Sequence, residues 1–281
     1  MLRIRTMTDA DVPLGMALKQ QANWNQLEAD WRRMLALEPD GCFLAEIDGV
    51  GVGTTVACTF GEVAWIAMVL VDERMRGQGV GKALMLHALE FLDQRGVRST
   101  RLDATPLGQP LYAKLGFEVE YTLVRHAGEL TAPNDAHGEP SVRIAPAPTW
   151  DDLIAFDTTI NGTPRGKFLR LLFAEDPAAV RCVAENGRIT GYLAVRPGCH
   201  ALQLGPCLAS PEAGPLLLAD AWRRYAGQRV LLDVPEQHGE AMALARRMGL
   251  QPQRPLVRMC RGPSVGEDVQ RLWASSGPEL G

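Results

Sequence analysis

The chain has 281 residues, a formal net charge of −4, and a hydrophobic content of 46%. That length accommodates two domains of ordinary size, and that composition predicts packed cores and excludes bulk disorder. A slightly acidic chain is not expected to bind nucleic acid, and no apolar run approaches the length of a membrane span. The first residues lack the apolar core of a secretory signal, so we expect a soluble, cytoplasmic protein without a membrane partner.

The first part of the chain predicts short strands alternating with amphipathic helices. A strand is expected over residues 2–6, and Thr8 with Asp11 is typical of a helix start. Leu27, Trp31 and Met34 then share one face of a helix. Further strands are predicted over residues 42–47, 51–60, 63–71, 100–103 and 117–124, and helices over residues 82–95 and 110–115.

Residues Arg74 to Leu84, RMRGQGVGKAL, place three glycines at alternate positions between an apolar strand and a helix. Glycine at this density lets backbone N–H groups close around an anion, and the dipole of the following helix adds to the attraction. A P-loop is excluded because Gly-x-x-x-x-Gly-Lys-Ser/Thr is absent. Lys82 stands where a dinucleotide-binding fingerprint needs its third glycine, which disfavours a dinucleotide-linked oxidoreductase.

The remaining pattern, Arg-Gly-x-Gly-x-Gly, with WIAMVLV before it and LYAKLGF after it, resembles the GNAT-type acyl-CoA N-acyltransferases. The resemblance covers residues 2–125, and the second motif supports it independently because the family places a Tyr ahead of a Gly-Phe pair there. It implies that the loop holds the pyrophosphate of acetyl-CoA. It also implies that the preceding strand pairs with the pantetheine arm and leaves a backbone N–H near the thioester oxygen. The cofactor-binding residues expected from the resemblance are Val69, Leu70, Val71, Arg76, Gly77, Gln78, Gly79, Val80, Gly81, Lys82 and Tyr112.

The same plan begins again later in the chain, at a spacing of roughly 130 to 140 residues. AENGRITGYLAV matches the earlier AEIDGVGVGTTV, and ARRMGL, ending at Leu250, matches YAKLGF, ending at Phe117. The second copy is shorter by about one loop between Leu208 and Asp233, and its ASPEAGPLLLADAW has no Gly-x-Gly-x-Gly. We therefore expect cofactor binding in the first copy only.

The expected architecture is α/β (α+β), with two tandem GNAT-like domains. Each is predicted to have a central mixed, mostly antiparallel sheet flanked by helices. The predicted order is a catalytic domain over 1–125, a Pro- and Gly-rich linker over 126–141, a degenerate domain over 142–261 and a C-terminal tail over 262–281.

Transfer of an acetyl group from a thioester requires a neutral amine, a stabilised oxyanion and a proton for the departing thiolate. The resemblance puts Tyr112 near the cofactor sulfur and makes it the expected general acid; a tyrosine that only packs its ring is the alternative. No general base is identifiable. Glu62 and Asp103 flank the central strands as candidates, with structural roles as the alternative, and many members of the family use water chains instead.

The segment NWNQ, residues 23–26, precedes a helix that often lines the acceptor pocket in this family. Trp24 and Asn25 are therefore candidate substrate contacts, together with Glu62 and Asp103; a core position for Trp24 and a helix cap for Asn25 are the alternatives. The six cysteines form no Cys-x-x-Cys pair and the five histidines no metal-like spacing, so we expect reduced packing cysteines and no metal.

Two functions remain open on the sequence. One is an acetyl-CoA-dependent N-acetyltransferase that acts on a small, unidentified, amino-acid-like amine. The other is a regulatory or binding module that senses acyl-CoA without turnover. A monomer or a homodimer is expected in either case.

Overall fold

The computed structural model describes residues 1–131, 144–146 and 149–281, so residues 132–141 of the predicted linker lie outside the described residues. The strands are β1 Leu2–Thr6, β2 Cys42–Ile47, β3 Val50–Phe60, β4 Val63–Val71, β5 Ser99–Ala104, β6 Glu118–Glu129, β7 Ile144–Pro146, β8 Arg181–Glu185, β9 Arg188–Arg196, β10 Leu202–Ala209, β11 Arg229–Pro235, β12 Gln251–Arg261 and β13 Leu272–Ala274. The helices are α1 Val12–Gln21, α2 Glu28–Leu37, α3 Val80–Gln94, α4 Gln109–Lys114, α5 Trp150–Asn161, α6 Gly166–Glu175, α7 Ala213–Arg224 and α8 Gly239–Arg247.

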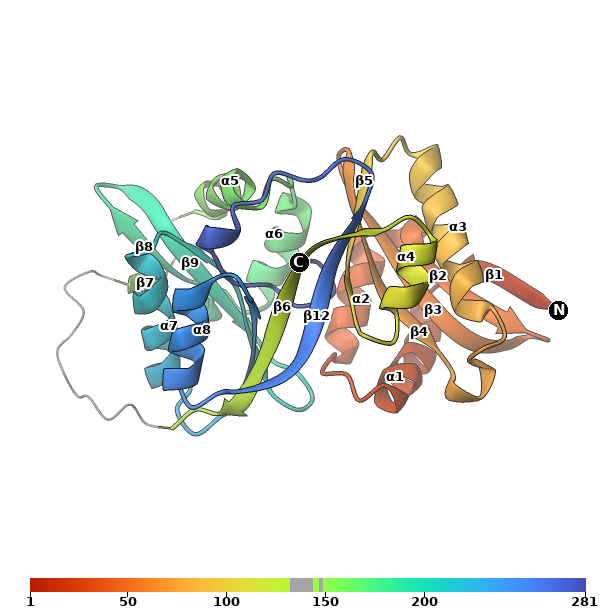
Figure 1. The fold of residues 1–281 in the computed structure, drawn as a ribbon, viewed down its shortest axis with the longest axis horizontal. Coiled ribbons are helices and arrows are strands. Elements are labelled where there is room, and N and C mark those ends of the chain that lie inside the picture. Colours follow the sequence, from red (N-terminus) through yellow and green to blue (C-terminus); the bar gives the residue numbers. More distant parts are fainter. Residues whose placement is uncertain (132–143, 147–148) are drawn as a thin grey trace.

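The strands form one continuous sheet in the order β1-β2-β3-β4-β5-β12-β6-β11-β10-β9-β8-β7, with β13 beside β10. Only the β4–β5 and β10–β11 pairs are parallel among the described strands. The predicted α/β architecture, with two mixed and mostly antiparallel arrays, is therefore confirmed. Figure 1 shows the two halves on either side of the long strands β6 and β12.

The two halves exchange their last long strands. Strand β12 of the second half pairs with β5 of the first, and β6 of the first half pairs with β11 of the second. The prediction that the linker starts at residue 126 is wrong, because His126 to Glu129 belong to β6. His126 has a register partner on each side, Leu232 of β11 and Pro252 of β12. Sheet pairing satisfies the backbone polar groups of this segment, which a free linker would expose to water.

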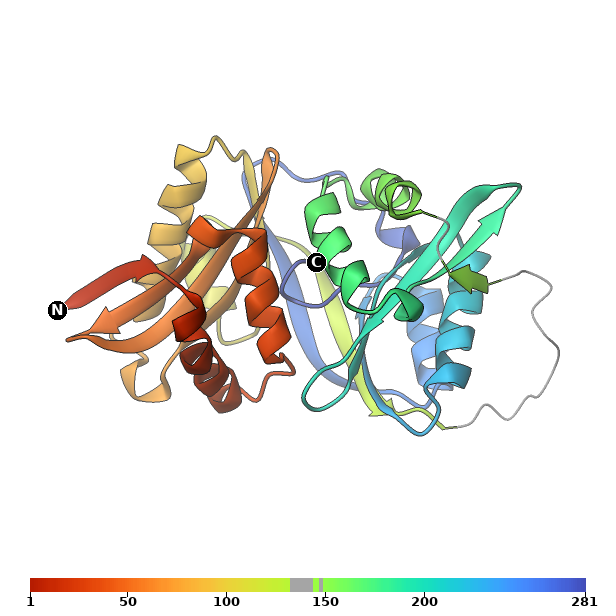
Figure 2. The same cartoon turned by 180° about the vertical axis from the view of Figure 1, so that it is seen from behind.

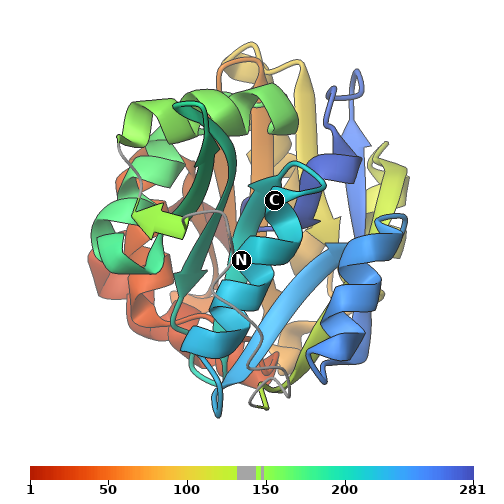
Figure 3. The ribbon, with the colours of Figure 1, turned by 90° about the vertical axis from the view of Figure 1, so that its left-hand side faces the viewer.

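The helices cover both faces of the sheet. Helix α3 packs its apolar stripe, which includes Leu84 and Met85, against the first-half strands. It starts at Val80, two residues before its predicted start. Helices α1, α2, α5 and α6 lie on the opposite face (Figure 2), and α7 and α8 lie on the other side of the second-half strands from α5 and α6 (Figure 3).

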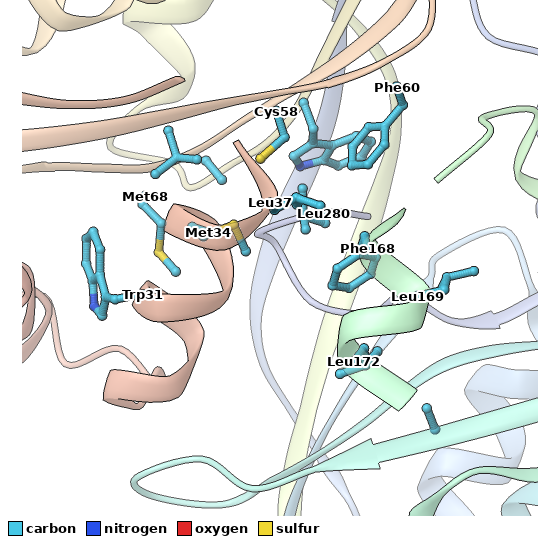
Figure 4. Packing of buried hydrophobic residues seen from close by; sticks show 14 of the residues in the cluster. Trp31, Met34, Leu37, Cys58, Phe60, Met68, Phe168, Leu169, Leu172 and Leu280 are labelled. Carbon is cyan, nitrogen blue, oxygen red and sulfur yellow. The ribbon is translucent and has the colours of Figure 1, made fainter. Parts of the chain in front are cut away.

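One buried apolar cluster extends through both halves. Met34 and Leu37 of α2 face Phe168 and Leu172 of α6 across it, and Leu280 of the C-terminal segment lies between them (Figure 4). The burial of such side chains is the main favourable term in packing two surfaces together. The halves are therefore joined by a common core as well as by the sheet.

Buried ion pairs also connect the two halves. Asp30 of α2 accepts hydrogen bonds from Arg33 at 2.8 Å and from Arg196 of β9 at 2.9 Å. Burial alone raises the pKa of a carboxyl, but the two guanidinium groups outweigh it and lower the pKa of Asp30. Removal of one partner from such a pair leaves an uncompensated buried charge, so these pairs resist relative movement of the halves.

Candidate functional site

A cavity of about 950 Å³ lies where β4 and β5 separate. These parallel strands pair only from Val63 to Trp65 and from Ser99 to Arg101. Beyond that point residues 66–71 of β4 pair with β3 on one side only, and no described strand pairs with their other edge, which runs along the cavity wall. A strand edge without a neighbour offers its N–H and C=O groups to an extended ligand, as in β-strand addition.

A β-bulge interrupts β4 in the middle of this wall. Thr54 pairs with Leu70 and Val56 pairs with Ala67, so Met68 and Val69 together face a single residue of β3. Met68 has a φ of 51°, in the left-handed region, and its carbonyl accepts a hydrogen bond from the Thr54 hydroxyl at 2.9 Å. Bulges are common next to active sites because they redirect groups that a regular ladder would use. Sequence patterns gave no indication of this bulge.

The glycine loop closes one end of the cavity. Gly77 and Gly79 have φ angles of 76° and 84°, and Gly79 precedes the first residue of α3. A Cβ atom added at either glycine would meet no atom within 4 Å, so the space in front of them is open. The unpaired N–H groups of the first turn of α3 and its dipole make this a favourable place for an anion.

Most predicted cofactor residues line this cavity. Residues 69–71, Arg76, Gly77, residues 79–82 and Tyr112 all contribute to its wall. Gln78 does not line it, and its side-chain amide donates to the carbonyl of Arg74 at 3.2 Å.

Tyr112 projects from α4 toward the cavity. The centroid of its ring lies 6.1 Å from that of Phe117. The ring also packs against Gly108, where an added Cβ atom would lie only 2.8 Å from a ring carbon of Tyr112. No described group hydrogen-bonds to its hydroxyl. Burial raises the pKa of Tyr112, so the phenol stays protonated at neutral pH, as a proton donor must.

The predicted substrate contacts separate into two groups. Trp24 and Asp103 line the cavity, whereas Asn25 and Glu62 do not. Asn25 donates to the carbonyl of Ala201 at 2.9 Å and accepts from the N–H groups of two residues in the same loop, so its amide joins the halves. Glu62 is exposed at the far end of β4, where it pairs with Arg98 at 3.4 Å. Neither residue contacts this cavity.

Asp103 is held by another side chain. Arg258 of β12 donates to both of its carboxylate oxygens, at 2.8 and 2.9 Å, and both side chains are fully buried. Burial raises the pKa of Asp103, and the opposing effect of Arg258 only partly offsets this. Both carboxylate oxygens are nevertheless occupied by the bidentate pair, which leaves neither of them directed at a ligand. This geometry favours the structural alternative for Asp103.

Sequence reasoning missed four cavity residues from the second half and the C-terminal segment. Arg254 and Leu256 lie on β12, and Pro278 and Glu279 follow β13. The sequence assigned them to a separate domain and to a tail, because no local pattern indicates that β12 inserts beside β5. The repeat itself was the available signal, because it indicates a final strand in each copy. It does not indicate which strand each of them pairs with.

The equivalent cleft of the second half is filled by the chain itself. Strand β13 pairs with β10 at Cys207 and Leu208, along the edge that corresponds to the open edge of β4. The indole of Trp273, from β13, packs against Gly214, the second residue of α7, where α3 has Gly81. Ala245 occupies the position that matches Tyr112 in the repeat. The second cleft therefore has neither the space nor the groups of the first.

Comparison with known families agrees with this geometry. Residues 9–117 match the model of the Acetyltransferase (GNAT) family, and residues 153–274 match that of an Acetyltransferase (GNAT) domain. The chain belongs to the GNAT acetyltransferase family and is a tandem member of it. Acyl transfer is the activity of the class. Within the described residues, no helix has the length and apolar character needed to cross a bilayer.

The chain is similar along most of its length to individual relatives. It is 25% identical to the holothin acyltransferase of Pseudoalteromonas sp. (strain SANK 73390), over 92% of this chain and 87% of that protein. It is 24% identical to the uncharacterized N-acetyltransferase YitH of Bacillus subtilis (strain 168), over 66% and 67% of the two chains.

Solved structures share the tandem fold. A putative acetyltransferase from Pyrococcus horikoshii has a TM-score of 0.84 and 25% identity, with 100% of this chain and 96% of that one covered. A tandem GNAT protein from the clavulanic acid biosynthesis pathway has a TM-score of 0.70 at 16% identity, over 94% and 100% of the two chains. The second likeness supports the fold alone.

Proposed function

We propose that this protein is an N-acetyltransferase that moves the acetyl group of acetyl-CoA to a primary amine of a small molecule by direct attack. One observation carries the proposal: a single cavity is lined by the unpaired edge of β4, the glycine loop and the Tyr112 side chain. The open space before Gly77 and Gly79 fits a pyrophosphate, and the free edge of β4 suits the extended pantetheine arm. Acetyl-CoA supplies the activated thioester.

The chain supplies positioning and proton transfer. The amine nitrogen forms a bond to the carbonyl carbon as the C–S bond breaks, and Tyr112 gives its proton to the departing sulfur. We assign stabilisation of the charge that develops on the carbonyl oxygen to backbone N–H groups at the β4 bulge, where the regular ladder with β3 is interrupted. The cavity carboxylates Asp103 and Glu279 are both paired with arginines, Arg258 and Arg196. The surplus proton of the amine therefore leaves through water, which also restores the Tyr112 proton.

The test is a thiol-release assay with acetyl-CoA and a panel of small amines. The panel includes amino acids, their amides and holothin, because the relative that aligns with 92% of the chain is named for that acceptor. Amine-dependent release of free thiol supports the proposal. Acetyl-CoA binding without release on any amine would favour an acyl-CoA sensor instead.

We expect one acetyl-CoA site per chain. The first cleft has the open strand edge and the glycine loop, whereas β13 and Trp273 occupy the second. Isothermal titration calorimetry on the full chain should give a stoichiometry of one. Two equivalent sites would contradict the assignment of the second half as unable to bind the cofactor.

A further inference from the structure

Arg254 is a half-buried cation of the cavity wall. No described carboxylate forms an ion pair with it and no described group accepts a hydrogen bond from it. Burial and the nearby charge of Arg125 lower the pKa of Arg254, and the attraction of Asp233 and Glu279, neither of which forms an ion pair with it, only partly opposes this. By contrast, Asp103 and Glu279 in the same wall are each paired with an arginine. A half-buried guanidinium usually has an anion to bind, and this one has an open cavity in front of it.

The side chain lies on the face of the sheet opposite the glycine loop. Val257 of β12 packs in the cluster that contains Leu84 of α3, whereas Leu256 packs in the cluster of α1 and α2. Because successive residues of a strand point to opposite faces, Arg254 shares the face of Leu256. The anion it meets is therefore separate from the phosphates expected at the α3 N-terminus.

The local backbone and its neighbours suit recognition of a small ligand. The register of β12 against β6 shifts between Pro252 and Arg254, and such irregularities redirect side chains beside active sites. Trp24, Met68 and Leu256 line the same cavity. Apolar walls reduce the local dielectric and strengthen a charge-assisted hydrogen bond.

We propose that Arg254 binds a carboxylate of the acceptor, so that the substrate is an amino acid or another amine that carries a carboxylate. This inference rests on the proposed acetyltransferase function. A planar carboxylate matches the two-pronged guanidinium and adds only one negative charge beside Asp233 and Glu279, which act on Arg254 without forming an ion pair. A phosphate dianion fits less well, because Glu279 contributes negative charge nearby. The second half would then have a defined role, which is to deliver the acceptor-binding residue on the exchanged strand β12.

The experiment compares matched acceptors in three proteins: wild type, Arg254→Gln and Arg261→Gln. Arg261 lies on the same strand, pairs with Asp93 at 3.3 Å and does not line the cavity, so it controls for loss of a β12 arginine. Each L-amino acid of a panel is compared with its amide and with O-phosphoethanolamine by kcat/KM at saturating acetyl-CoA. Binding of the N-acetyl amino acids and of their amides is measured in parallel by calorimetry.

Wild type and Arg261→Gln should prefer at least one carboxylate over its amide by roughly 10- to 100-fold, and Arg254→Gln should lose that preference. The affinity for acetyl-CoA should be unchanged in all three proteins. Equal use of acids and amides by the wild type, a preference that persists in Arg254→Gln, or a higher activity on O-phosphoethanolamine would overturn the inference.

The binding arm separates this inference from the proposed function. If no amine releases thiol, the acetyltransferase proposal fails, but binding of N-acetyl amino acids still reports on Arg254. Tighter wild-type binding of the acids than of the amides, lost in Arg254→Gln, supports the carboxylate site even then. Absence of any carboxylate-dependent binding in the wild type overturns it whether or not turnover occurs.

Discussion

Gly79→Val is expected to abolish measurable acetyl-CoA binding while the protein remains folded. Gly79 precedes α3 at the cavity end, and its α-carbon faces open space where the pyrophosphate is proposed to lie. A valine side chain would fill that space and keep the phosphate from the N–H groups of the first helical turn. Loss of two or more such charge-assisted hydrogen bonds corresponds to a fall in affinity of roughly 100-fold or more.

The same substitution also strains the backbone, and a second variant separates the two effects. Gly79 has a φ of 84°, which a β-branched residue adopts at a cost of roughly 1–3 kcal/mol. Gly96 follows the other end of α3 with a φ of 71° and equally open surroundings, but it does not line the cavity. Gly96→Val should therefore lose similar stability in thermal unfolding and keep its acetyl-CoA affinity in calorimetry. Normal acetyl-CoA affinity in Gly79→Val, or an equal loss of acetyl-CoA affinity in both variants, would show that the loop does not hold the phosphates.

Local sequence patterns predicted the first half of the fold well, because its elements are set by nearby residues. The apolar run 63–71 and the strand 42–47 match β4 and β2 residue for residue. The alternating glycines predicted the loop, and the apolar residues at helical spacing after them predicted α3. These features depend on turn chemistry and hydrophobic periodicity, which are local properties.

The strand exchange and the acceptor side of the cavity could not be predicted in this way. Whether β12 pairs with β5 or stays within its own half depends on long-range packing and leaves no periodic pattern in the sequence. Arg254 and Glu279 enter the cavity only through that exchange and the path of the C-terminal segment. Asn25 was predicted as a substrate contact, but it binds the carbonyl of Ala201 in the other half. A polar residue beside a helix start is compatible with either role.

The second copy of the fold has the architecture of the first without its open cleft. Gly214 corresponds in place to Gly81, but here the missing side chain makes room for the indole of Trp273 and not for a ligand. The chain satisfies the free edge of β10 with β13, so the hydrogen bonds that a ligand would make are internal. Natural sheets cover or pair exposed edges in just this manner. The space that corresponds to the first cleft is therefore part of the core of the second half.

Tyr112→Phe is expected to lower kcat by roughly 10²- to 10⁴-fold without changing the affinity for acetyl-CoA. The substitution keeps the ring that packs against Phe117 and Gly108 and removes only the hydroxyl. No described group hydrogen-bonds to that hydroxyl, so its loss leaves no partner unsatisfied and should cost little stability. Tyr225→Phe supplies the control, because Tyr225 is a partly buried tyrosine of the second half that does not line the cavity.

The decisive measurement is single-turnover thiol release at saturating acetyl-CoA, with an acceptor whose chemical step limits the rate. An interaction made only as the C–S bond breaks appears in kcat and not in ground-state binding, so calorimetry should give one affinity for wild type and variant. Burial raises the pKa of Tyr112, and the wild-type hydroxyl therefore remains a donor across neutral and mildly alkaline pH. The rate difference between wild type and Tyr112→Phe should accordingly persist over that range. If turnover is unchanged by the substitution, Tyr112 belongs to the cofactor wall and water alone protonates the departing thiolate.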